Sequence, residues 1–274
     1  MHHPAPRAHA IPSHAAPRPS GPRRTRFWRI SPWRSALGLA TLLTFAAPLP
    51  VQAEPSCAVP EAMALRGLTL PATRAIATSG KPLTILTLGG TQTAGTEAGD
   101  QSATWPARLE AALAAALPNA TVSVVNEALP GSTAADISPR IAGLLTKTGA
   151  RLVIWASGGR DAAQRSDPDS FRASLQTGID AIRDGGADLI LIDAPFVPAP
   201  ERMARIEPYR QKLLRAAADN QIPLFRRHDL MRGWSENKTL NLAARGDTER
   251  QAVARHLFAC VARGLAAPIV EALR

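Results

Sequence analysis

The stretch LTILTLGGTQTAG, residues 83–95, decides how the rest of the chain is interpreted. Its first half is a short run of apolar and β-branched residues, which is typical of a buried strand. Gly89 and Gly90 end the run, and glycine allows a sharp turn that brings backbone N–H groups close to a ligand. Thr91 follows at the tip of the turn, where many hydrolases carry a nucleophilic side chain. The segment therefore predicts a strand and, directly after it, a candidate site.

Strand-like and helix-like segments alternate from this stretch onward. Apolar runs predict strands over residues 83–88, 121–125, 151–156, 187–193 and 221–226. Helical patterning predicts helices over residues 105–117, 136–147, 168–184, 201–220 and 248–265, with Pro268 just beyond the last of them. Strands that are apolar throughout favour a parallel sheet covered on both faces. We therefore expect an α/β fold, a flavodoxin-like three-layer α/β/α sandwich with a five-stranded parallel sheet.

The first 53 residues differ in composition from the rest. They contain seven arginines and no lysine, aspartate or glutamate, and an apolar run of about 15 residues ends shortly before Ala53. A basic start, an apolar run and a small-x-small ending describe a secretory signal peptide. The alternative is a membrane-anchored N-terminus, although the run is short for a span. Residues 54–82, with four prolines, are predicted to be an irregular lead-in, and residues 83–274 to form the domain.

The positive charge of the chain is concentrated in this leader. Seven of the ten formal net positive charges lie there, which leaves about +3 for the remainder. Nucleic-acid binding needs a basic patch in the mature domain, and the sequence contains no convincing one. We therefore expect an exported protein, periplasmic or secreted, with no nucleic-acid partner and no stable membrane span in the mature chain. The oligomeric state stays open.

The chain contains two cysteines, Cys57 and Cys260. A single cysteine pair in an exported protein favours a disulfide, which here would join the two ends of the mature chain. The closed loop of about 200 residues corresponds to at most roughly 5 kcal/mol of stabilisation in the chain-entropy treatment. The alternative is two unpaired thiols.

The order of these segments resembles the SGNH (GDSL-type) hydrolase family between residues 83 and 265. The family's first block is a strand followed by Gly-Asp-Ser, and here it reads Gly89-Gly90-Thr91. The resemblance places Thr91 at the nucleophile position and Gly90 beside it as a ligand-binding residue. Trp105-Pro106 matches the aromatic-proline pair that often opens the next helix of the family.

Two further blocks of the family supply groups for an oxyanion hole. After the second strand, VVNEALPG places Asn126 at the strand end and Gly131 at the glycine whose N–H donates to the oxyanion. After the third strand, the family's Gly-x-Asn-Asp reads Gly158-Gly159-Arg160-Asp161, so that Arg160 replaces the asparagine donor. The resemblance therefore implies that Asn126, Gly131 and Arg160 bind the ligand or an oxyanion.

The family's fourth block, Asp-x-x-His before the last helix, is missing. Alignment on Cys260 puts Glu249 and Ala252 at its two positions. The mature chain contains only two histidines, His228 and His256. A general base must reach the hydroxyl group that it activates, so His228, which follows the fifth strand, is the candidate base.

Each of the two unusual residues also has a structural interpretation. Thr91 could cap the segment that follows it, since a β-branched secondary alcohol is a poor nucleophile without a base. Arg160 could form an ion pair with Asp161 or Asp193. In the site itself, its planar charged fork would suit a carboxylate, phosphate or sulfate.

Three functions are consistent with these residues. The first is a catalytically impaired, esterase-like protein that binds an acyl, glycan or anionic ligand at the former active site. The second is an active ester hydrolase, on O-acetyl or lipid esters, with Thr91 as nucleophile and His228 as base. The third is a structural or partner-binding envelope protein that keeps the fold without using the site. No cofactor and no metal site is expected.

Overall fold

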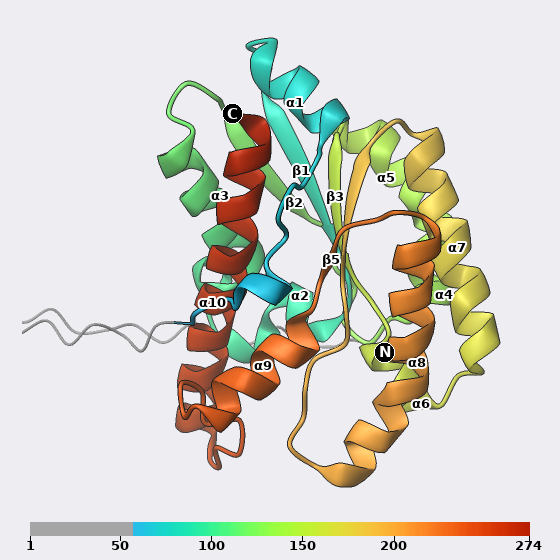
Figure 1. Cartoon of the computed structure of the whole chain (residues 1–274), viewed down its shortest axis with the longest axis vertical. Coiled ribbons are helices and arrows are strands. Elements are labelled where there is room, and N and C mark those ends of the chain that lie inside the picture. Colours follow the sequence, from blue (N-terminus) through green and yellow to red (C-terminus); the bar gives the residue numbers. More distant parts are fainter. Residues whose placement is uncertain (1–56) are drawn as a thin grey trace, which may run out of the picture. The chain divides into compact units, whose positions relative to one another are not determined.

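The computed structural model describes residues 57–274, and the predicted leader lies outside them. A five-stranded parallel sheet has the strand order β2-β1-β3-β4-β5 (Figure 1). The strands are β1 (Leu83–Leu88), β2 (Val122–Asn126), β3 (Leu152–Ala156), β4 (Asp188–Ile192) and β5 (Leu224–Phe225). Every residue of β3 is buried, because helices cover both faces of the sheet. The predicted α/β class and five-stranded parallel sheet are confirmed.

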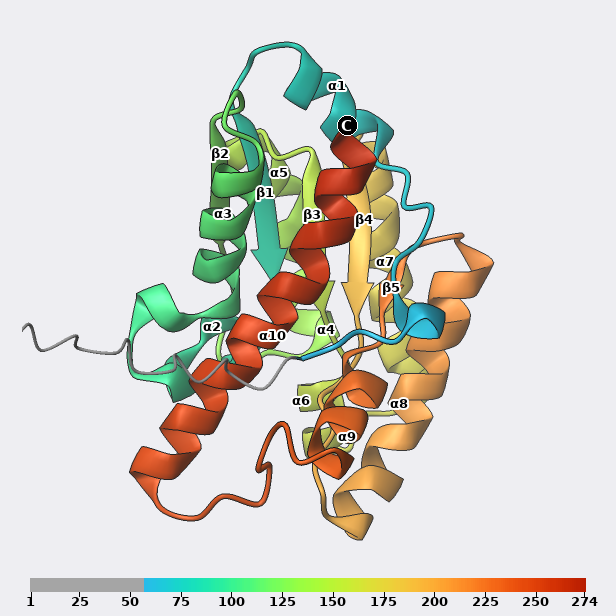
Figure 2. The same cartoon turned by 60° about the vertical axis from the view of Figure 1, so that its left-hand side comes forward.

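Helices form the two outer layers. The α-helices are α1 (Pro71–Thr78), α2 (Thr91–Ala94), α3 (Trp105–Ala116), α4 (Ala134–Ile137), α5 (Ile141–Thr148), α6 (Gly159–Gln164), α7 (Pro168–Asp184), α8 (Pro200–Asp219), α9 (Arg227–Glu236) and α10 (Asp247–Leu273). Short 3-10 helices occupy Glu61–Met63 (η1), Thr96–Ala98 (η2), Gln101–Ala103 (η3) and Ser138–Arg140 (η4). One face of the sheet packs on α3 and α10, and the other on α5, α7 and α8 (Figure 2).

The direction in which strands are added to the sheet reverses after β2. β2 lies on one side of β1, and β3 and the later strands lie on the other side. β1 pairs in parallel with β2 on one side and with β3 on the other. The segments that leave these two neighbouring strands therefore depart toward opposite sides of the sheet. In open parallel sheets, ligands bind beyond the carboxyl ends of the strands at such a point. The fold thus places the turn at Gly89–Thr91 where a ligand is expected.

The last helix is longer than the sequence pattern predicts. The expected end near residue 265, with Pro268 outside the helix, is wrong, because α10 continues through Pro268 to Leu273. A proline inside a helix costs about 3 kcal/mol. Ile269, Val270 and Leu273 are all buried, and burial of each contributes about 1.5–3 kcal/mol, which outweighs that cost. By length and composition α10 could cross a membrane, yet just over half of its most apolar window is buried in this fold, as in a core helix.

Other elements also differ from the prediction. The lead-in over 54–82 is not wholly irregular, since it contains α1, whose first residue, Pro71, suits the first turn of a helix. The single helix predicted over 136–147 is divided into α4, η4 and α5, because Pro139 lacks the N–H that a continuous helix needs. β5 is shorter than expected, and α9 follows it directly.

A disulfide joins Cys57, the first described residue, to Cys260 in α10, at a sequence separation of 203. The two Cα atoms lie 5.4 Å apart, within the usual range for a disulfide. The predicted pairing is confirmed, and the alternative of two unpaired thiols is wrong.

Candidate functional site

A cavity of about 410 Å³ lies at the carboxyl edge of the sheet. Segments that follow each of the five strands contribute to its walls, which consist of residues 90–93, 132–134, 137, 156–163, 195, 197, 202, 205–206 and 227. This volume is within the range of pockets that bind small organic ligands. The cavity is therefore the candidate functional site.

Gly90 and Thr91 both line the cavity, as the sequence predicts. Thr91 is exposed at the first position of α2, and its hydroxyl makes no hydrogen bond within residues 57–274. The structural alternative, in which Thr91 caps the following segment, is wrong, since Gly90 is the N-cap and no side chain caps α2. The hydroxyl is thus free for a ligand, but no side chain activates it in this structure.

Arg160 also lines the cavity, from the first turn of α6. The predicted ion pairs with Asp161 or Asp193 are not formed among the described residues. Instead, its Nε and Nη2 lie 2.9 and 3.0 Å from the side-chain oxygen of Gln164 when that amide is oriented to accept. Arg160 therefore lines the cavity without a salt bridge among the described residues, although, after the hydrogen bonds from Thr133, its positive charge helps to lower the pKa of Asp136.

Asn126 and Gly131 lie outside the cavity walls. The Asn126 amide donates to the Thr93 carbonyl at 2.9 Å, and its oxygen accepts from the Thr87 hydroxyl at 3.1 Å. This side chain therefore holds α2 against the ends of β1 and β2. Gly131 has a φ of 80°, which an L side chain rarely adopts, and it forms the turn that precedes α4.

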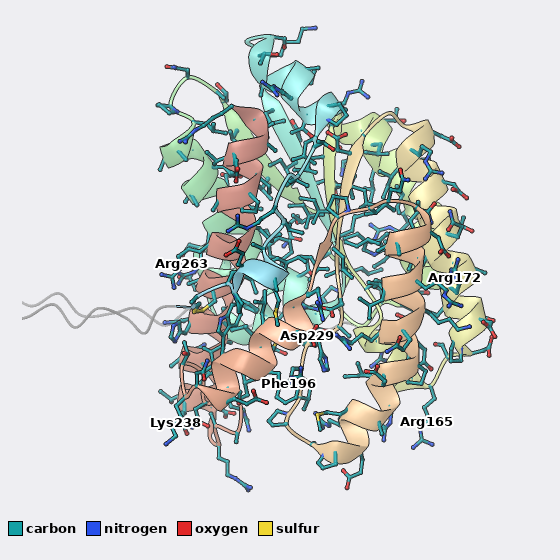
Figure 3. The ribbon with its side chains drawn as sticks, in the orientation of Figure 1. Arg165, Arg172, Phe196, Asp229, Lys238 and Arg263 are labelled. Carbon is teal, nitrogen blue, oxygen red and sulfur yellow. A yellow bond between two sulfur atoms is a disulfide. The ribbon has the colours of Figure 1, made fainter. Side chains whose placement is uncertain are left out.

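His228 is buried in the first turn of α9 and does not line the cavity. Its ring packs edge-on against Phe196, with the ring centroids 5.4 Å apart, and its Nδ1 makes no hydrogen bond within the described chain. Phe196 is labelled in Figure 3, together with Asp229 of the same helix as His228. Burial, and then the positive charge of Arg210, lower the pKa of His228. His256 lies beside the disulfide, with Nε2 3.6 Å from Cys57 Sγ.

A buried ionic network lies next to His228. Asp193 accepts a hydrogen bond from the His228 backbone N–H at 2.8 Å and one from Arg210 Nε at 3.2 Å. Arg210 also donates to Asp229 at 2.6 Å. Burial raises the pKa of Asp193 to about 6, although these donors oppose the rise. The network fixes the start of α9 against the end of β4.

Four arginines and one acidic residue line the cavity. Arg160, Arg202 and Arg205, which we call the mouth arginines, retain contact with solvent, whereas Arg227 is 4% exposed. The acidic residue is Asp161, and burial raises the pKa of its carboxyl. Burial likewise lowers the pKa of Arg227 to about 10. The cavity therefore has an excess of positive charge.

Sequence reasoning missed Arg227, Thr93 and Ser157, which also line the cavity. A signal for Arg227 was present, because a charged residue directly follows a strand whose end faces this edge of the sheet. Thr93 and Ser157 gave no comparable signal, since small hydroxyl residues are common in every kind of turn.

A family model described as the Non-GDSL lipase-like family matches residues 56–274. No curated protein matches the chain. Among solved structures, a lipase/acylhydrolase from Enterococcus faecalis has a TM-score of 0.52 and 20% identity, over 67% of this chain and 95% of the other. The acetyl xylan esterase AlAXEase has a TM-score of 0.51 and 16% identity, and the match covers 64% of this chain and 97% of the other. TesA has a TM-score of 0.47 and 27% identity, and the match covers 52% of this chain and 76% of the other.

The two solved structures with a TM-score above 0.5 show only that the fold is shared, because their sequence identity to this chain is low. The family match covers most of the chain, including every element that lines the cavity. The chain belongs to the Non-GDSL lipase-like family, and it has the SGNH-hydrolase fold.

Proposed function

We propose that this protein binds a small anionic ligand, of acyl or glycan type, in the cavity, and that it is a catalytically impaired member of its lineage. The observation that carries the proposal is the charge of the walls, which combine four arginines with a single acidic residue. None of the four arginines forms a salt bridge within residues 57–274. A bound anion would supply these arginines with a direct ionic partner.

The arrangement is poorly suited to ester hydrolysis. A hydroxyl nucleophile needs a general base within about 2.6–3.2 Å, and no histidine is among the described residues that line the cavity. Arg160 at the oxyanion position would hold an anionic group as firmly in the ground state as in the transition state. Equal binding of the two states does not accelerate the reaction. These features support a protein that binds an anionic ligand, in preference to an enzyme that hydrolyses an ester.

One observation favours a second candidate function, an ester hydrolase with Thr91 as nucleophile. The Thr91 side chain is exposed at the cavity, where a substrate carbonyl could approach it. That function requires a base from outside the cavity walls, such as His228 after a rearrangement of α9. Loss of turnover in Thr91→Ala would identify it.

We also propose that the protein is exported to the periplasm or the exterior of the cell. The Arg-rich leader followed by an apolar run supports export, and the Cys57–Cys260 disulfide is compatible with an oxidising compartment. A fractionation experiment that detects the protein only in the cytoplasm would contradict this assignment.

The anion-binding proposal is tested by thermal unfolding of the full-length protein with sodium phosphate or sodium hexanoate, against sodium chloride at equal ionic strength. A ligand at about 100 times its Kd stabilises a protein by about 2.7 kcal/mol. We expect a rise in Tm with at least one of the two anions. The triple variant Arg160→Gln, Arg202→Gln, Arg205→Gln should lose most of that rise.

The matched control removes the same charge elsewhere. Arg165, Arg172 and Arg263, labelled in Figure 3, do not line the cavity, and their triple glutamine variant should keep the rise in Tm. No rise with either anion, or equal losses in the two triple variants, would overturn the proposal.

A further inference from the structure

The geometry points to a carboxylate-binding site at the floor of the cavity, formed by Thr93, Ser157 and Arg227. We infer that the ligand is an organic monocarboxylate with an apolar body. This inference rests on the proposed function, because it names the class of anion that the same cavity would hold. We call the three residues the floor triad.

The floor triad consists of three buried polar side chains, two of which, the hydroxyls of Thr93 and Ser157, lack hydrogen-bond partners among the described residues. Thr93, Ser157 and Arg227 are 1%, 7% and 4% exposed, and all three line the cavity. The hydroxyls of Thr93 and Ser157 make no hydrogen bond within residues 57–274. A buried hydroxyl without a partner costs about 1–3 kcal/mol. By contrast, the Thr133 hydroxyl, which lines the same cavity, donates to Asp136 at 2.7 Å.

Contacts with the end of β4 place Ser157, which follows β3, and Arg227, which follows β5, on either side of that strand. The Ser157 N–H donates to the Ile192 carbonyl at 3.1 Å. Arg227 donates from Nε and Nη2 to the carbonyl of the next residue, Asp193, at 3.1 and 2.7 Å. The Ser157 backbone and the Arg227 side chain are therefore both held at the end of β4.

Thr93 reaches the same place from α2. A Cβ built on Gly89 would lie 2.4 Å from Thr93 Oγ1 and 3.1 Å from the Ala156 carbonyl oxygen. The Thr93 hydroxyl therefore lies beside the residue that precedes Ser157. Only glycine at position 89 leaves room for this approach.

Arg227 supplies the charge of the floor. Its Nη1 makes no hydrogen bond within the described chain, and no carboxylate there lies within salt-bridge distance of the guanidinium. The negative charges of Asp193 and Glu97 partly offset the cost of burying this charge, but neither carboxylate forms a salt bridge with it. The N–H groups that Asp193 does not engage can donate to a carboxylate, the partner that a guanidinium fork fits best.

The floor triad itself suits a monoanion. It offers one guanidinium and two neutral hydroxyls, whereas the three mouth arginines retain contact with solvent. Ile137, Val197 and Ile206 form apolar parts of the walls and suit a short hydrocarbon body. A carboxylate with an aliphatic chain matches both parts of the cavity better than a dianionic phosphate does.

The test is a calorimetric titration of the full-length protein with sodium hexanoate and, separately, with inorganic phosphate. Thr93→Val and Ser157→Ala each remove one buried hydroxyl that has no protein partner, so both variants should fold with a Tm no lower than that of the wild type. We expect each to weaken hexanoate binding about tenfold, which corresponds to about 1.4 kcal/mol. Thr177→Val, on the exposed surface of α7, is the matched control and should bind hexanoate like the wild type.

The outcomes separate this inference from the proposed function. Hexanoate binding that both floor variants weaken supports the floor triad. Hexanoate binding that is equal in the wild type and both variants overturns the triad and leaves anion binding intact. Tighter binding of phosphate than of hexanoate overturns the monocarboxylate class alone. Binding of neither anion overturns both proposals.

Discussion

Arg227 donates two hydrogen bonds to the backbone carbonyl of Asp193, from Nε at 3.1 Å and from Nη2 at 2.7 Å. The contact joins the first residue of α9 to the end of β4, and it fixes the plane of the guanidinium. A planar fork held in this way loses little further freedom when a ligand binds. The fold thus presents a pre-oriented positive charge to the cavity.

Arg227→Lys should weaken hexanoate binding by about tenfold, because an ammonium group cannot hold the Asp193 carbonyl and a carboxylate in the same geometry. Loss of the two backbone contacts should also lower the free energy of unfolding by about 1–3 kcal/mol. Titration calorimetry and urea unfolding measure the two effects. Arg232→Lys, on the exposed side of the same helix, is the control, and equal effects in the two variants would count against the account.

Gly89→Ala should disturb both stability and binding. The new Cβ would meet Thr93 Oγ1 at 2.4 Å, so Thr93 and the end of β3 must move, at a cost of about 1–3 kcal/mol. Gly143→Ala is the matched control, because its Cβ would contact nothing within 4 Å. An alanine at that interior position of α5 should stabilise the protein by about 0.5–1 kcal/mol. Unchanged unfolding and hexanoate affinity in Gly89→Ala would contradict the described packing.

The fold was predictable because its signals are local and repeated. Apolar strands ended by glycine or a polar residue, and helices with an apolar stripe, specify a parallel sheet without knowledge of long-range contacts. The errors fall where tertiary packing outweighs a local rule, as at Pro268 in α10, whose following residues are buried. α9 was not predicted because its apolar face, formed by Leu230, Met231 and Trp234, is short and lies among charged residues in the sequence.

The site was only partly predictable. Gly90, Thr91 and Arg160 each follow a predicted strand, and they line the same cavity. This was predictable because the carboxyl ends of parallel strands lie at one edge of the sheet. The sequence could not show that His228 packs against Phe196 instead of facing a ligand, because the direction of a side chain in the first turn of a helix depends on where that helix begins.

The stability of the protein should depend on the ionisation of Asp193. Its pKa is raised by burial to about 6 in the folded state, above its ordinary value of 3.8. The folded state therefore holds a proton that the unfolded state releases between these values, so the stabilisation is present below about pH 4 and is lost as pH rises through about 6. Asp193→Asn removes this titration.

The free energy of unfolding of the wild type minus that of Asp193→Asn should thus decrease by about 1–3 kcal/mol from pH 4 to pH 7. Urea unfolding of both proteins across this range measures the difference, and the contribution of His228 is common to both. A difference that is constant, or that increases with pH, would show that the pKa of Asp193 is not raised.

Thr91→Ala should leave hydrolysis of p-nitrophenyl butyrate unchanged in the full-length protein. The reason is that the Thr91 hydroxyl has no partner within the described chain that could remove its proton. Initial rates of the wild type and the variant, each corrected for buffer hydrolysis, make the comparison. Turnover that disappears in Thr91→Ala would instead establish an active hydrolase with this nucleophile.

The most direct test of the account compares two ligands that share a hydrocarbon chain and differ in the charge of the head group. Sodium hexanoate and hexanamide share an apolar chain, but hexanamide offers the cavity no negative charge. Calorimetric titration of the full-length protein should show one hexanoate bound per chain and at least about tenfold weaker binding of hexanamide, as expected when a charged hydrogen-bond acceptor is lost. Equal affinity for the two compounds, or no binding of hexanoate, would contradict the central claim that the cavity is built to hold an anion.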